Sequence, residues 1–403
     1  MSLTLDAPAA AHGLPARSIG ASGCHVRVAT TFGDVEAVWR VLEADAVFSA
    51  YQAFDWLQIF HRHLAGDETP CLAVISDDAG RAQALLPLVL STSRGLTSAR
   101  FMGGSHANFG LGLWRPAFAE AMTPDRLTMV LRDIAAAAPH PVDLFRLTGQ
   151  PESWAGLANP FARLPHQPSP SFGYHLALGP DADAVIERVV SKDSRKKLRK
   201  KERALAEHGA VSFRLARDVA EVERFTDLFL AWKAARFAEL GIANVFAEPG
   251  TRAFIIEAAT RGLSEGRPVI ELSALMVGDE PVALFGGTVA GGRFSGMFNA
   301  MTTGPMTRES PGELLLHHLI RHCCARGLSV FDLGAGEAQY KSNLCDGVDP
   351  LFDQFIAMSW KGRLAASVEA FAMRAKRAVK QSDWLWPLIV KLRRARGKAA
   401  AGR

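Results

Sequence analysis

Ionisable side chains gather around a glycine-rich turn at residues 334–336. Asp332 precedes this turn, and Glu337, Tyr340 and Lys341 follow it. Acyl transfer from a thioester to an amine or hydroxyl needs a base for the nucleophile and often an acid for the leaving thiolate. Glu337 or Asp332 could be the base and Tyr340 the acid, whereas Lys341 could pair with a phosphate. The alternative for each residue is a structural hydrogen bond within a loop.

A predicted helix start lies before this turn and would supply the phosphate site. Ser310 is a favourable N-cap, Pro311 suits the first helical turn, and Glu313 completes a capping box. Gly312 lets a ligand approach the backbone closely. Because the first amides of a helix point outward at its positive end, this start is predicted to bind an anion such as a pyrophosphate. An ordinary capping box on a helix with a buried apolar stripe is the competing interpretation.

The predicted elements follow a similar order in two halves of the chain. After a disordered lead at 1–24, the first half is predicted to contain a strand at 26–28, helices at 35–45 and 53–64, a hairpin across 77–80, a helix at 127–138 and a strand at 142–148. A proline-rich junction separates the two halves. The second half is predicted to begin with a strand at 174–178, a basic helix at 182–208, a strand at 211–215 and helices at 219–240 and 251–265. It is predicted to continue with a three-stranded meander over 269–301, a helix at 311–326, and strands at 329–333 and 352–360.

The helix start and the Asp-Leu-Gly-x-Gly…Tyr-Lys segment after it resemble the second half of the GNAT acyltransferase superfamily. More closely, they resemble a tandem-GNAT group that includes bacterial proteins of cellulose and exopolysaccharide production, with the Fem peptidyltransferases as distant relatives. The resemblance is strongest over residues 176–360 and weaker over 26–164. The usual glycine-rich loop is reduced here to 301–312, which carries only Gly304 and Gly312.

This resemblance implies an α/β (α+β) protein of two tandem GNAT-like domains, at 25–165 and 171–360. Each would be a mixed, partly antiparallel sheet flanked by helices, followed by a basic amphipathic tail at 361–403. The implied reaction is direct transfer of an acyl group from acyl-CoA to a small-molecule, lipid or polysaccharide-related acceptor, without a metal. The implied cofactor-binding residues are Ser310, Pro311, Gly312, Glu313 and Lys341.

Two other functions stay open beside acyl-CoA chemistry. One is Fem-like transfer of an aminoacyl group from tRNA, with the basic helix as the tRNA contact. The other is a non-catalytic accessory protein of polysaccharide synthesis at a membrane. A methyltransferase that binds S-adenosylmethionine is disfavoured, because the glycine-rich segment lies late in the chain and Ala338 replaces the third glycine.

Composition points to a cytoplasmic globular protein. The 403 residues are 48% hydrophobic and 22% charged, and no apolar run is long enough to cross a bilayer. No secretory signal is evident at the N-terminus. The five cysteines are odd in number and lack metal-ligand spacing, so neither disulfides nor a metal site is expected.

The net charge of +5 is unevenly distributed. Residues 192–203 carry eight basic and two acidic side chains, and residues 361–403 carry twelve basic and two acidic ones. A solvated surface is the simple interpretation of the first segment. In the second, Leu364, Val368 and Phe371 recur at helical spacing, and Trp384 and Trp386 follow. This pattern predicts either docking on the protein body or peripheral binding to an anionic inner membrane.

Overall fold

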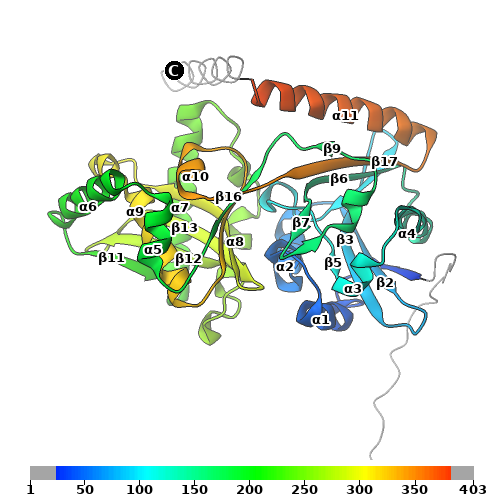
Figure 1. The fold of residues 1–403 in the computed structure, drawn as a ribbon, viewed down its shortest axis with the longest axis horizontal. Helices are drawn as coiled ribbons and strands as arrows, with labels where there is room; N and C mark the ends of the chain where they lie inside the picture. Colours follow the sequence, from blue (N-terminus) through cyan, green and yellow to red (C-terminus); the bar gives the residue numbers. More distant parts are fainter. Residues whose placement is uncertain (1–23, 383–403) are drawn as a thin grey trace, which may run out of the picture.

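The computed structural model describes residues 24–382, which form two lobes, each built on one mixed sheet (Figure 1). The first sheet has the order β1 (His25–Ala29), β2 (Thr69–Ser76), β3 (Ala82–Ser93), β4 (Leu96–Phe101), β6 (Leu144–Pro151), β17 (Leu351–Ala357) and β9 (Gln167–Pro168), with β5 (Leu113–Trp114) beside β3. The second has the order β11 (Val211–Leu215), β12 (Glu271–Val277), β13 (Glu280–Ala290), β14 (Arg293–Met301), β15 (Val330–Ala335), β10 (Gly173–Ala177) and β16 (Gly347–Asp349). A short hairpin joins β7 (Ser153–Trp154) and β8 (Leu157–Ala158).

Helices flank both sheets, which confirms the predicted α/β architecture. The first lobe carries α1 (Glu36–Asp45), α2 (Phe54–Leu64), α3 (Pro116–Glu120) and α4 (Pro124–Ala137). The second carries α5 (Ala182–Val189), α6 (Lys192–Ala206), α7 (Val219–Leu240), α8 (Thr251–Thr260), α9 (Pro311–Ala325) and α10 (Gln339–Leu344). The last described helix, α11 (Trp360–Lys380), contacts β17 and β6 of the first sheet.

The two sheets share one pairing pattern. In each, all neighbours are antiparallel except one central pair, β4 with β6 and β14 with β15, which are parallel. Each parallel pair is joined through a helix, α4 in the first half and α9 in the second. The repeated element order predicted for the two halves is therefore present as a repeated sheet topology.

One strand of the second half lies in the sheet of the first. β17, at the end of the second half in sequence, pairs with β6 of the first sheet, whereas β10, at its start, pairs with β15 within the second sheet. The prediction that 352–360 closes the second half is therefore wrong at the level of the sheet. Sequence proximity favours neighbouring partners, but the unpaired backbone groups of β6 accept any strand that reaches them. The domain ranges 25–165 and 171–360 stay predictions.

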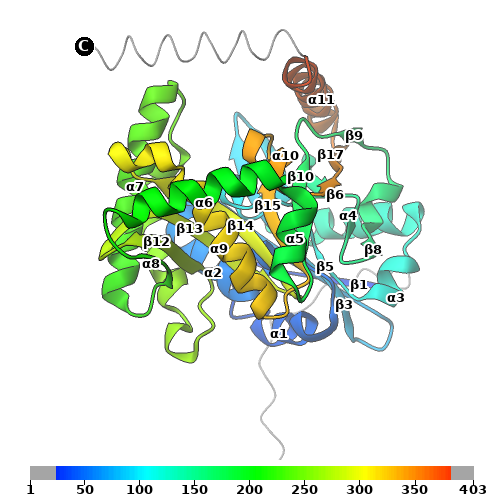
Figure 2. The ribbon, with the colours of Figure 1, turned by 60° about the vertical axis from the view of Figure 1, so that its left-hand side comes forward.

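The predicted basic helix at 182–208 is two helices rather than one. α5 ends at Val189, and Ser191 opens α6 by accepting a hydrogen bond from the Ser194 amide at 3.2 Å. A serine side chain that satisfies a first-turn amide is a strong signal for a new helix. Figure 2 shows α5, α6 and α9 together on one face of the second sheet.

The two lobes share an apolar core. Helix α2 of the first half contacts α8 of the second, and the ring centroids of Trp56 and Phe254 are 5.5 Å apart. Both side chains are fully buried. Aromatic pairs of this kind add to the free energy gained from apolar burial. The halves are therefore held together by packing as well as by the pairing of β17 with β6.

Candidate functional site

The parallel strands β14 and β15 separate along their length. They pair at only three positions, from Arg293 with Val330 to Ser295 with Asp332. Beyond this point Gly296 faces Gly287 while Phe298 faces Gly286, which leaves Met297 as an extra residue. Such a bulge removes backbone groups from the ladder and often lies beside an active site. The opening between these strands is the natural place for an extended ligand.

Two side chains of the first half span this opening on one side. Tyr51 donates to the Gly296 carbonyl at 3.1 Å. The Asn108 amide group donates to the same carbonyl at 3.1 Å and to Tyr51 Oη at 2.5 Å, and its oxygen accepts from the Ala335 amide at 3.2 Å. Gly334 is needed here, because a Cβ would lie 2.4 Å from Asn108 Nδ2 and its φ is +74°. The first half therefore helps to shape the site.

Asp332 lies in a buried ionic network behind the opening. Its carboxylate accepts from Arg293 Nε at 3.1 Å and from the Gly334 amide at 2.6 Å, and it is fully buried. Arg293 also contacts Asp349 at 3.1 Å, and Asp349 contacts His175 Nδ1 at 2.9 Å. Burial raises the pKa of Asp332, while Arg293 opposes that rise. Both carboxylate oxygens of Asp332 are thus occupied by protein partners.

Tyr340 lies at the open end of the strands. Its hydroxyl accepts from Asn299 Nδ2 at 3.2 Å, so its own proton is free for another acceptor. Burial raises the pKa of Tyr340, although 38% of the residue is exposed. The group is therefore protonated near neutral pH and suited to donating a proton.

Lys233 of α7 approaches the same end of β14. Its Nζ donates to the Asn299 carbonyl at 2.9 Å and lies 5.3 Å from the Phe237 ring centroid and 5.7 Å from that of Phe246. Burial lowers the pKa of Lys233 to about 8. Sequence reasoning missed both Asn299 and Lys233, because neither belongs to a motif. Only their position at the end of a strand and inside an apolar stretch of α7 sets them apart.

Glu337 and Lys341 follow β15 but are held by different elements. Glu337 accepts from the Phe172 amide at 3.2 Å and pairs with Lys380 of α11 at 3.0 Å. Lys341 is buried and donates to the carbonyls of Gly334 at 3.2 Å and Ala335 at 2.9 Å. Burial lowers the pKa of Lys341 to about 8. Lys341 therefore binds the end of β15, and its predicted phosphate contact stays a prediction.

The start of α9 differs from the predicted capping box. Ser310 has φ 49° and ψ 53°, in the left-handed region, and its side chain caps no amide. Instead, Ser310 Oγ accepts from Lys201 of α6 at 2.5 Å. The amides of Glu313 and Leu314 donate to the Ser310 carbonyl at 3.0 and 3.2 Å. The capping-box prediction is wrong because the left-handed backbone leaves the Ser310 side chain without an amide to cap.

The other predicted cofactor residues surround this turn. Pro311 is buried as the first residue of α9, and Glu313 is exposed. A Cβ added to Gly312 would meet Met301 Sδ at 3.6 Å, an ordinary contact, so packing alone does not require glycine there. Sequence reasoning did not single out Lys201 from the other cations of α6. Within residues 24–382, no cluster of histidine, cysteine and carboxylate side chains is arranged to hold a metal ion.

Comparison with known proteins gives a class for this fold and site. Residues 192–342 match the family described as an acetyltransferase (GNAT) domain. A structure of FemX superposes with a TM-score of 0.55 at 10% identity, over 81% of this chain and 96% of FemX. The C-terminal domain of a putative lysylphosphatidylglycerol synthetase from Agrobacterium fabrum superposes with a TM-score of 0.49 at 11% identity, over 84% of this chain and 95% of that one. No curated protein sequence matches.

The family match covers β14 and β15, between which the opening described above lies, and the helix start at 310–313. The FemX superposition shows a common fold across both halves. Residues 192–342 are thus similar to a GNAT acetyltransferase domain.

Proposed function

We propose that this protein transfers an acyl group from acyl-CoA to an amine or hydroxyl, with the thioester lying between β14 and β15. The observation that carries the proposal is the early separation of two parallel strands, with a bulge at Met297 and a phenolic donor at the open end. A backbone amide freed by a bulge can stabilise the oxyanion of a tetrahedral intermediate.

In this reaction the acceptor nitrogen or oxygen forms a bond to the acyl carbon, and the carbon–sulfur bond breaks. Tyr340 gives its proton to the leaving thiolate, for which its free O–H suits it, and its raised pKa keeps the phenol protonated before the step. Glu337, on the same loop, is the candidate base and would exchange the Phe172 amide and Lys380 for the proton of the acceptor. Asp332 is fully buried and orients β14 and β15 through Arg293 and the Gly334 amide.

The pyrophosphate would lie at the start of α9. Lys201 already reaches this turn through Ser310 Oγ, and Arg308 is exposed beside it. The Gly312 amide lies in the first turn, where backbone donors favour anions. A hydrogen bond to a charged group contributes about 1.5–3 kcal/mol, so loss of Lys201 is expected to weaken binding by about 10–150-fold.

Titration calorimetry with acetyl-CoA and longer acyl-CoAs tests this assignment. Lys201→Met should bind the preferred acyl-CoA more weakly by that factor, whereas Lys200→Met, an exposed neighbour on α6, should bind as the wild type does. Equal affinity in Lys201→Met would remove the pyrophosphate from this turn. If no acyl-CoA binds the wild type at millimolar concentration, the proposed reaction is wrong.

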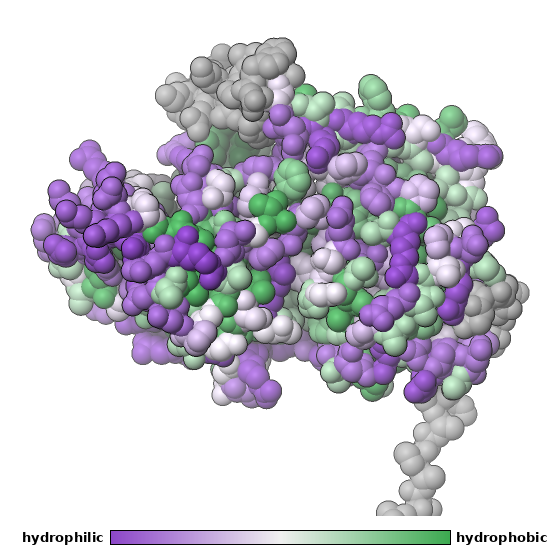
Figure 3. Space-filling model, viewed as in Figure 1, coloured by the Kyte–Doolittle hydropathy of each residue, from purple (hydrophilic) through white to green (hydrophobic). Residues whose placement is uncertain are grey.

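The exposed face of α6 favours aminoacyl-tRNA as a second possible donor of the transferred group. Six cations of this helix are exposed: Lys192, Lys196, Lys197, Arg199, Lys200 and Arg203. Figure 3 shows hydrophilic residues covering this end of the molecule. A polyanion such as aminoacyl-tRNA would meet complementary charge here, and its affinity would fall steeply with salt. A thermal-shift series with charged tRNA, acetyl-CoA and S-adenosylmethionine separates the donors, because each ligand stabilises only a protein that binds it.

Helix α11 supports a place for the enzyme at an anionic membrane surface. Its outer face exposes 64% of Trp360, 63% of Leu364, 68% of Val368 and 72% of Phe371. Its inner face is fixed to the first lobe, for example by Arg374 to Gln167 at 2.9 Å. An amphipathic helix with aromatic residues and flanking cations binds the interface of anionic bilayers. The predicted tail residues Trp384 and Trp386 lie outside the described residues.

Replacing exposed residues on the outer face of α11, rather than removing the helix, tests whether the protein binds an anionic membrane. Phe371→Ser and Leu364→Ser together should abolish sedimentation with phosphatidylglycerol vesicles at low salt and leave the fold intact, because both side chains are exposed. No helix in the described part of the chain is long and apolar enough to span a bilayer. If the wild type does not sediment with these vesicles, the outer face of α11 is not a membrane contact.

A further inference from the structure

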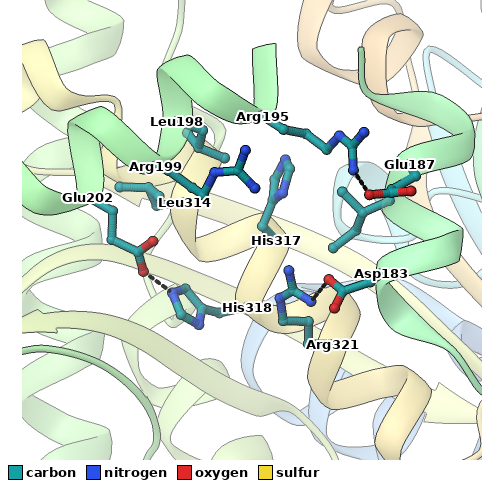
Figure 4. Close-up of a pocket in the computed structure, with 11 residues that line it drawn as sticks. Asp183, Glu187, Arg195, Leu198, Arg199, Glu202, Leu314, His317, His318 and Arg321 are labelled. Atoms are coloured by element: carbon teal, nitrogen blue, oxygen red, sulfur yellow. Dashed lines mark hydrogen bonds and ion pairs between the residues drawn. The ribbon is translucent and has the colours of Figure 1, made fainter. Parts of the chain in front are cut away.

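A cavity of about 310 Å³ lies between α5, α6 and α9, on the side of α9 that faces these helices (Figure 4). Its lining comprises Asp183, Ile186 and Glu187 of α5, Arg195, Leu198, Arg199 and Glu202 of α6, and Leu314, His317, His318 and Arg321 of α9. Pockets of this size hold small organic molecules. None of these residues takes part in the opening between β14 and β15.

Three carboxylates of the cavity already have protein partners, two of them arginines and the third the His318 ring. Asp183 contacts Arg321 at 2.6 Å, Glu187 pairs with Arg195, and Glu202 contacts His318 at 3.0 Å. Arg199, by contrast, has no hydrogen-bond or ion-pair partner among residues 24–382. One guanidinium is therefore left without a protein partner at the cavity.

His317 supplies a second unused polar group. The residue is 8% exposed, and its buried Nε2 has no hydrogen-bond partner among the described residues. Figure 4 shows its imidazole between Arg195 and Arg199 in the middle of the lining. Burial lowers the pKa of His317 to about 4, and the positive charge of Arg321 adds to this effect. The imidazole is therefore neutral near pH 7, and a buried polar atom of this kind is costly unless a partner satisfies it.

We propose that this cavity binds a small organic carboxylate with an apolar body. Arg199 would pair with the carboxylate, His317 Nε2 would hydrogen-bond to one of its oxygens, and Ile186, Leu198 and Leu314 would contact the apolar body. A single unpaired guanidinium matches a monoanion better than a pyrophosphate. No lining residue of the cavity is among those proposed to hold acyl-CoA, and the carboxylate site does not depend on that proposal.

The test uses the full chain and a defined set of probes. Acetate, hexanoate, benzoate, hexanamide and inorganic phosphate would each be titrated at up to 10 mM and followed by melting temperature and by the NMR signals of the histidine rings. Hexanoate or benzoate should raise the melting temperature and shift the His317 resonances, because a ligand that binds the folded state stabilises it. Hexanamide, which lacks the charge, should do neither.

Two substitutions on the same helix locate the site. Arg199→Gln should weaken hexanoate binding at least tenfold, whereas Lys200→Gln should leave it unchanged. His317→Gln provides a second check on affinity if the variant folds. The proposal is overturned if neither hexanoate nor benzoate binds the wild type, if hexanamide or phosphate binds as well as hexanoate does, or if Arg199→Gln binds hexanoate as tightly as Lys200→Gln.

Discussion

Replacing Arg293 by Met should destabilise the fold more than any other change in the candidate site. Arg293 is only 13% exposed and contacts Asp332 and Asp349 at 3.1 Å each. Its guanidinium also lies 3.9 Å from the ring centroid of Trp154, a residue of the first half. One side chain therefore pairs with two carboxylates and joins the two lobes.

The magnitude follows from what the substitution leaves behind. Removing one partner of a buried ion pair costs about 3–5 kcal/mol, because the other charge stays buried without compensation. Loss of the cation–π contact adds about 0.5–2 kcal/mol. The ion-pair term alone corresponds to a fall in melting temperature of about 6–20 °C for a domain of 150–250 residues.

The loss should also depend on pH. Because the pKa of Asp332 is raised in the folded protein, the folded state binds more protons than the unfolded state between the two pKa values. Stability therefore falls as pH rises through that window. Without Arg293 the folded-state pKa rises further and the window widens upward. The difference between wild type and variant should thus be smaller at pH 5 than at pH 8, by up to about 1.4 kcal/mol per pH unit.

Urea unfolding at pH 5 and pH 8 measures both effects. Arg293→Lys keeps the positive charge and should lose less stability at pH 8. The double variant Arg293→Met with Asp332→Asn should be more stable at pH 8 than Arg293→Met alone, because the buried charge is gone. A single variant within about 1 kcal/mol of wild type, or an equal loss at both pH values, would refute the reasoning about this network.

Three further predictions concern neighbouring groups. Tyr340→Phe should lower turnover by about 10²–10⁴-fold with little change in acyl-CoA affinity, measured by thiol release, and full activity would remove Tyr340 from the chemistry. Lys233→Met should melt at a higher temperature than the wild type at pH 7, and this difference should shrink towards pH 10. The reason is that the folded-state pKa of Lys233 is about 8, so the wild type becomes more stable as pH rises above 8. A difference in melting temperature that does not change with pH would contradict this. Gly312→Glu should abolish acyl-CoA binding and Gly312→Ala should not, because a Cβ fits there; equal binding by both would argue against a phosphate at this turn.

The element order was predictable because its signals are local. The Gly-Asp-Glu turn at 278–280 separates two apolar runs, and β12 and β13 do form a hairpin there. Alternation and turn residues report on a few neighbouring positions, so they predict strands but not distant partners. The pairing of β17 with the first sheet lies beyond such signals, because the backbone groups at a sheet edge accept any strand that reaches them.

The candidate site was predictable only where its residues are neighbours in sequence. The loop from Asp332 to Lys341 was identified as ionisable, yet Asn108, which accepts from its Ala335 amide, and Tyr51, which accepts from Asn108, come from the first half. Nothing in their local sequence indicates a contact with β15. The capping box failed for a related reason: Ser310 binds Lys201, a residue far away in sequence, and its backbone is left-handed.

The position of Tyr51 and Asn108 gives the first half a specific part in the site. They reach the Gly296 carbonyl and the Ala335 amide, which lie on the two strands that separate. Side chains that bridge both strands set the width of the opening on that side, whereas among residues 24–382 the Tyr340 end is crossed by the hydrogen bond from Asn299. Tyr340 itself is 38% exposed, so this end can be reached from solvent. In the proposed reaction, an acyl donor that enters from the start of α9 would meet an acceptor at this end, and the first half would position the two strands rather than supply a second reactive centre.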